Sequence, residues 1–167
     1  MSTRAVYTFF DDEDDGSYHV YKHHDGYPSG AYEAITNALE YAWQLPRYEA
    51  DEFAAAFVAG NKSSYKNQLL ELLSKPKRTK AECAEIKHLK EMHEKGYSGG
   101  GIRLITPERG DMPAKDAALA FAGDIEFRYE IRCREGVLHI TAFPARSEQE
   151  IFSGTLDEMK VWAEQNA

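Results

Sequence analysis

The segment 125–143 constrains the fold of this chain more than any other. Apolar and charged residues alternate over residues 125–134, a pattern that is typical of a β-strand with one buried face and one wet face. Glu135 and Gly136 suit a two-residue hairpin turn, and a second apolar strand follows at residues 137–143. Folding the chain back at this turn places the apolar residues of both strands on one face, so the pattern predicts a β-hairpin. The expected apolar pairs are Cys133 with Leu138, Ile131 with Ile140, and Tyr129 with Ala142, and the wet face would carry Arg128, Glu130, Arg132 and His139.

Periodicity elsewhere predicts the remaining strands and helices. Residues 5–10 and 17–23 are β-branched and aromatic, and they indicate another hairpin. Apolar stripes at helical spacing and short apolar runs indicate helices at 31–43, from about 49, at 65–73, 83–92, 117–122 and 155–163, and short strands at 102–106 and 150–153. Thr79 with Glu82, and Thr155 with Glu158, have the spacing of capping boxes. This order predicts an α+β fold, with an antiparallel sheet packed on one face by helices.

Residues 61–97 differ from the rest of the chain in charge. They hold nine bases and five acids, a net charge of +4, whereas the whole chain has −8. Two amphipathic helices joined by the basic loop 75–79 form an αα-hairpin in this region, and a run of three glycines follows at 99–101. We therefore expect a single domain over residues 1–167 with an inserted helical hairpin. Residues 62–95 could also join copies of the chain in a homo-oligomer.

Length and composition narrow the class of protein. A chain of 167 residues suits one globular domain. It contains no apolar run long enough to span a membrane, and its first residues lack the apolar core of a signal peptide, so we expect a cytoplasmic protein with no membrane partner. Cys83 and Cys133 are expected to be reduced thiols. The acidic balance argues against direct binding of nucleic acid.

The densest group of chemically active side chains follows the second strand, at residues 22–30. Two imidazoles, a carboxylate, a phenol and an ammonium lie there, between a strand and the start of a helix whose free N–H groups favour anions. A phosphate or nucleotide could bind at this point, with a histidine as general base oriented by Asp25. The candidate catalytic residues are His23, His24 and Asp25, and the candidate ligand-binding residues are Lys22, His23, His24, Asp25, Tyr27 and Ser29.

A structural interpretation of the same loop stays open beside the functional one. In it, Asp25 and Gly26 form the turn, Tyr27 packs into the core, and Ser29 or Gly30 caps the helix. No metal site is expected, because four residues of strand separate His19 from His23 by roughly 13 Å. No nucleotide-binding glycine motif is present, and we expect no cofactor.

An acidic run joins the first two strands. It comprises Asp11, Asp12, Glu13, Asp14 and Asp15. The run lacks the twelve-residue spacing and the closing glutamate of a calcium loop, so a solvated turn is expected. These five carboxylates are the candidate partner-binding residues.

The loop after the second strand also carries a resemblance. The segment 20–30 reads Val-Tyr-Lys-His-His-Asp-Gly-Tyr-Pro-Ser-Gly, which resembles a His-x-Asp-Gly-Tyr-Pro-x-Gly type loop of uncharacterised phage and prophage proteins. The resemblance implies a mobile-element protein that works in the cytoplasm of a bacterial host. Small acidic proteins of that kind often block host defence proteins or host enzymes by binding them. No catalytic residue follows from the resemblance.

Three hypotheses about function follow. The first is a phage-type binding protein, not an enzyme, which interferes with a host defence protein or a host nucleic-acid-handling protein through an acidic surface. The second is binding or hydrolysis of a small nucleotide or phosphate ligand at residues 23–30. The third is a structural oligomer.

Overall fold

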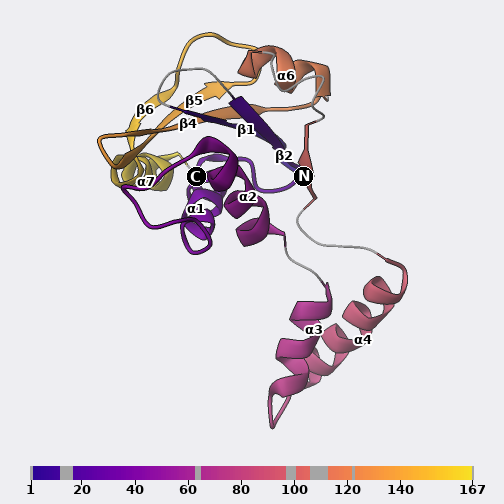
Figure 1. The fold of residues 1–167 in the computed structure, drawn as a ribbon. Helices are drawn as coiled ribbons and strands as arrows, with labels where there is room; N and C mark the ends of the chain where they lie inside the picture. Colours follow the sequence, from indigo (N-terminus) through magenta and orange to yellow (C-terminus); the bar gives the residue numbers. More distant parts are fainter. Residues whose placement is uncertain are drawn as a thin grey trace. The chain divides into compact units, whose positions relative to one another are not determined.

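The computed structural model describes residues 2–11, 17–62, 65–96, 101–105, 113–121 and 123–166. The chain forms two compact units, which we call the body and the hairpin unit. The body comprises residues 1–61 and 102–167, and the hairpin unit comprises residues 62–101 (Figure 1).

A six-stranded sheet with the order β3-β2-β1-β4-β5-β6 forms the centre of the body. The strands are β1 (Ala5–Phe10), β2 (Ser17–Lys22), β3 (Ile102–Leu104), β4 (Phe127–Arg134), β5 (Val137–Pro144) and β6 (Phe152–Thr155). All neighbouring strands are antiparallel except β1 and β4, which are parallel. With its helices, this mainly antiparallel sheet gives an α+β fold, as the sequence predicted.

The hairpin of β4 and β5 has the predicted register. Cys133 lies opposite Leu138, and Ile131 lies opposite Ile140. All four of these side chains are buried. Gly136 adopts a positive φ of 77°, which glycine permits at little steric cost, and this allows the tight turn. The prediction from alternation and turn chemistry is therefore confirmed.

Helices cover both faces of the sheet. One face carries α1 (Pro28–Leu39), α2 (Ala50–Asn61) and α7 (Leu156–Gln165), and α6 (Ala114–Phe121) lies on the other face, at the top of Figure 1. The main core lies under the first three helices. Its aromatic centre brings Tyr7 and Phe9 of β1 against Phe57 of α2, with ring centroids 4.5 and 5.3 Å apart.

Two features of the sheet were not expected from the sequence. The parallel pairing of β1 and β4 joins the two hairpins of the sheet side by side. The sequence does not predict this direction, because a long connection allows β4 to run either way beside β1. The alternation of residues indicates only which face of a strand is apolar. The second face also has its own small core, in which Ala117 and Ala118 of α6 pack with side chains that include Val6, Tyr21 and Ile125.

Arg128 corrects a further expectation. It was expected on a wet face, yet its side chain is 2% exposed. It lies on the face of the sheet that α6 partly covers. There its guanidinium stacks on the Phe143 ring at 3.8 Å and donates to the carbonyl oxygen of Ser147 at 2.9 Å.

The hairpin unit consists of two packed helices, α3 (Tyr65–Ser74) and α4 (Lys80–Glu94). Thr79 and Glu82 form the predicted capping box at the start of α4. Arg78 donates to the carbonyl oxygens of Leu72 and Leu73 in the last turn of α3, and it thereby helps to cap the C-terminal end of that helix. Within the described ranges, no helix is long and apolar enough to cross a membrane.

Candidate functional site

Gly26 anchors the loop between β2 and α1 to the sheet. Its N–H donates to the carbonyl oxygen of Thr3 at 2.9 Å, and the Tyr129 hydroxyl donates to its carbonyl oxygen at 2.8 Å. A Cβ atom at this position would lie 2.8 Å from the Cβ of Ala5. The glycine is therefore required by close packing, and the middle of the loop has a structural role.

The start of α1 differs from two of the three parts of the structural interpretation, namely the packing of Tyr27 and the helix cap. The N-cap is Tyr27, whose side chain makes no capping hydrogen bond, and Ser29 and Gly30 lie within the helix. The Tyr27 side chain is 40% exposed and does not pack into the core. Asp25 turns the chain with a positive φ of 55°, and its carbonyl group comes so close to Gly30 that a side chain there would collide with it.

His23 is engaged by two neighbours on the α6 side of the sheet. The Tyr21 hydroxyl lies 2.6 Å from its Nδ1 atom, and Arg4 Nε donates to the same atom at 3.3 Å. Because the guanidinium can only donate, Nδ1 accepts, and the proton of the neutral imidazole lies on Nε2. Burial and then the Arg4 charge hold the pKa of His23 below its usual value of 6.5. In this arrangement the ring has no free lone pair for general-base catalysis.

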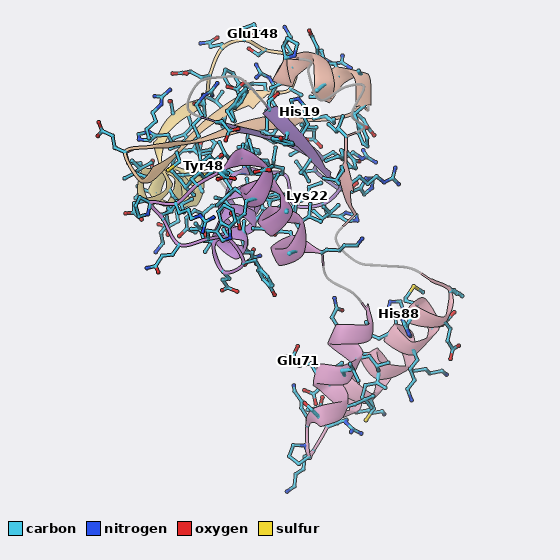
Figure 2. All side chains as sticks on the ribbon, viewed as in Figure 1. His19, Lys22, Tyr48, Glu71, His88 and Glu148 are labelled. Atoms are coloured by element: carbon cyan, nitrogen blue, oxygen red, sulfur yellow. The ribbon has the colours of Figure 1, made fainter. Side chains whose placement is uncertain are left out.

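Lys22 lies on the helix side of the sheet, because successive side chains of β2 alternate between the faces. It is buried, and its ammonium group donates to the carbonyl oxygen of His24 (Figure 2). Burial lowers the pKa of Lys22, while the charges of Asp25 and Glu33 oppose that shift. The same Asp25 carboxylate raises the pKa of Tyr27.

The six predicted ligand-binding residues thus fall into two groups. His23 and His24 form one, with their rings in edge contact at 4.6 Å. Lys22, Asp25 and Tyr27 form the other, near Glu33 and the start of α1, where Ser29 is half-buried. Two carboxylates beside one ammonium leave an excess of negative charge, which disfavours a phosphate. Across the described part of the chain, no three His, Cys, Asp or Glu side chains are placed to hold a metal ion.

Acidic side chains gather around the start of α2. The Asp11 carboxylate accepts from the N–H of Ala50 at 2.8 Å, and it thereby caps a helix 39 residues further along the chain. Glu49, Asp51 and Glu52 lie at that helix start, where the helix dipole favours negative charge. We call Asp11, Glu49, Asp51 and Glu52 the acidic corner. The other four predicted partner-binding residues, at 12–15, lie outside the described residues.

An exposed aromatic side chain adjoins the acidic corner. The N–H of Trp43 donates to Glu52 Oε1 at 3.0 Å, and the Arg47 guanidinium lies 3.6 Å from the centroid of the Trp43 ring. The Tyr48 hydroxyl donates to the carbonyl oxygen of Phe10 at 3.1 Å, which holds this segment against the end of β1 (Figure 2). Sequence reasoning missed the contribution of Trp43 and of the α2 acids, because no local signal predicts contacts over such separations.

The sequence patterns also did not predict a polar network on the second face of the sheet, the face that α6 partly covers. Arg128 Nη1 contacts Glu130 Oε1 at 3.1 Å, and Arg132 contacts Oε2 of the same carboxylate at 3.3 Å. Glu148 pairs with Lys115 of α6 at 3.0 Å and lies 3.6 Å from Arg128 (Figure 2). These ion pairs connect α6 with β4 and the segment after β5. The alanine-rich sequence of α6 is the feature that could have predicted a helix packed on the second face of the sheet.

Comparison with family models, with curated proteins and with solved structures finds no significant match to this chain.

Proposed function

We propose that this protein is a non-catalytic binding protein of phage type, and that its acidic corner engages a basic surface on a host protein. The observation that supports this most is the hydrogen bond from Ala50 to Asp11. It joins Asp11, the first residue of the acidic run, to the acids at the start of α2, so that residues far apart in the sequence contribute to one acidic surface. Concentrated charge of one sign attracts a partner of opposite charge and raises the rate of association.

The aromatic side chain beside the corner supports a protein partner. Trp43 is 36% exposed and carries Arg47 on its ring. Tryptophan and arginine are the residue types that most often contribute large parts of the binding energy in protein interfaces. Charge at the rim and an aromatic side chain next to it together suit a basic partner surface that contains an apolar pocket.

The charge of the body favours a basic partner. The whole chain has 20 bases and 28 acids; without the nine and five of the hairpin unit, the body keeps 11 bases and 23 acids, a net charge of −12. Such a surface repels nucleic acid. The acidic surface of the body suits a partner protein whose own surface is basic because that partner handles nucleic acid. Such a partner agrees with the host target that the phage resemblance implies.

Catalysis at the loop 23–27 has less support. His23 is occupied by Tyr21 and Arg4, Lys22 by the backbone, and Asp25 and Glu33 oppose an anionic ligand. These contacts favour a structural role for the loop over nucleotide binding or hydrolysis.

The first test identifies the partner and then measures its association. A photo-crosslinking residue in place of Trp43 should capture a basic host protein, whereas the same residue in place of Val161, exposed on α7, should not. Association of that protein is then measured at low and high salt. The corner variant changes Glu49 and Asp51 of the corner, together with Asp12, Asp14 and Asp15, which follow Asp11 in the sequence, to lysine. Asp11 and Glu52 are kept, because their hydrogen bonds with Ala50 and Trp43 join separate segments of the chain, whereas Asp51 accepts from the N–H of its neighbour Glu52.

The matched control has the same net charge with the changes placed elsewhere. It converts five exposed acids elsewhere in the body to lysine, namely Asp116, Glu126, Glu150, Asp157 and Glu164. We expect the corner variant to associate at least about tenfold more slowly at low salt, with a weaker salt dependence, and the control to stay within about threefold of the parent. Equal losses in both variants would disprove a role for the corner. Loss of binding in a stably folded His23→Ala/His24→Ala variant would move the site to the loop.

A further inference from the structure

The hairpin unit has a very small core of its own. It spans 40 residues, and isolated units of about that size usually need a metal, a disulfide or oligomerisation to be stable. Among the described side chains of α3 and α4, only Ile86 and Leu89 are buried. They lie three residues apart on α4 and form its inner stripe.

A second apolar stripe on α3 faces solvent. Leu70 is 55% exposed and Leu73 is 38% exposed, and their spacing of three residues places them on one side of the helix. Leu69 and Leu72 on α3 are half-buried instead. The hairpin unit therefore has an inner apolar face and an exposed one, and two packed helices cannot cover both.

The distribution of charge indicates what covers the exposed stripe. The helices are nearly neutral, since α3 and α4 together hold four bases and five acids. The excess of positive charge lies outside them, mainly in the connecting loop 75–79, which has three bases and no acid. Helix surfaces that carry both positive and negative charges can pair with identical surfaces, provided that the basic loops 75–79 of the two copies are kept apart.

We propose that the hairpin unit binds the hairpin unit of a second copy of this chain in an antiparallel four-helix bundle, with Leu70 and Leu73 of both copies in the shared face. This inference does not depend on the acidic corner. An antiparallel two-fold arrangement through α3 points the basic loops in opposite directions, separated by about 15 Å, the length of this ten-residue helix. That distance exceeds the Debye length of about 8 Å at physiological salt, so the loops repel one another little.

The mass of the intact chain in solution tests the proposal. Sedimentation equilibrium over the micromolar range should show the parent chain approaching the mass of two chains. Leu70→Gln/Leu73→Gln should weaken self-association roughly a hundredfold or more, because four buried leucines are lost from each dimer. Leu104→Gln/Val161→Gln is the matched control, since both residues are exposed in the body, and it should dimerise like the parent. A parent that keeps the mass of one chain, or a Leu70/Leu73 variant that dimerises normally, overturns the proposal.

A nitroxide label on the parent protein tests the geometry without any substitution. Cys83, near the start of α4, is exposed, whereas Cys133 in the sheet is buried, so the label goes to Cys83. In the antiparallel bundle the two α4 helices flank the shared α3 face, so one inter-label distance on the order of 25 Å is expected, set mainly by the width of about two helices. Absence of any dipolar coupling contradicts the proposed bundle. Masses above that of two chains also contradict it.

Discussion

At the scale of single residues, His23 makes the stability of the body depend on pH. Burial, and after it mainly the charge of Arg4, holds the pKa of its imidazole below 6.5, while Asp124 opposes the shift. The unfolded chain therefore takes up a proton on His23 at a higher pH than the folded chain does. The free energy of unfolding is unaffected above about pH 6.5, and it falls as the pH drops from there towards the folded pKa.

Removal of His23 tests this dependence. His23→Gln lacks the titrating group, so its free energy of unfolding should rise relative to that of the parent as the pH falls from about 7.5 to about 5.5. Urea denaturation at several pH values measures the difference, and His88→Gln, at an exposed position on α4, controls for the loss of an imidazole elsewhere. Parallel pH profiles for His23→Gln and the parent would show that the folded structure does not shift this titration.

Among the secondary-structure elements, the β4–β5 hairpin has one face in the main core and an opposite, outer face, and side-chain burial differs between them. Ile131 is fully buried opposite Ile140, whereas Val137, at the turn, is 46% exposed opposite Arg134. Burial of side chains, more than strand pairing itself, should therefore determine which substitutions in this hairpin destabilise the body.

Truncation of the two positions checks this directly. Ile131→Ala should lower the free energy of unfolding by roughly 2–5 kcal/mol, because it leaves a cavity in the core. Val137→Ala should cost less than about 1 kcal/mol, because its side chain is partly solvated in the folded state. Chemical denaturation of both variants gives the comparison, and similar losses at the two positions would contradict the burial assigned to the two faces.

At the scale of the whole molecule, the two units differ in charge and in apolar contacts. The body has a net charge of −12, and the hairpin unit has +4. Both hydrophobic clusters of the sheet consist of residues outside 62–101. The folded body should therefore not require the hairpin unit.

Deletion of the hairpin unit tests this independence. Replacement of residues 62–101 by a flexible Gly-Ser linker should leave a protein that unfolds cooperatively, with the far-UV signal of the remaining helices and sheet. Thermal and urea unfolding monitored by circular dichroism measure it. A deletion variant without a cooperative transition would show that the body depends on the deleted residues for its core.

Local sequence patterns were sufficient to predict the features that depend on neighbouring residues. Alternation and the turn at Glu135 and Gly136 predicted the β4–β5 register, and the Thr79 and Thr155 capping boxes predicted two helix starts. Each of these results from contacts within a few residues or across one tight turn, where spacing alone sets the geometry.

The contacts between distant segments became apparent from the folded chain. Folding made β1 parallel to β4, buried Arg128 on the face that α6 partly covers, and brought Asp11 to the start of α2. It also divided the candidate residues of the loop, since His23 lies on one face of the sheet and Lys22 on the other. Side-chain types reveal what a residue can do, but long-range packing decides which partners it has, because contacts between distant segments leave no periodic trace in the sequence.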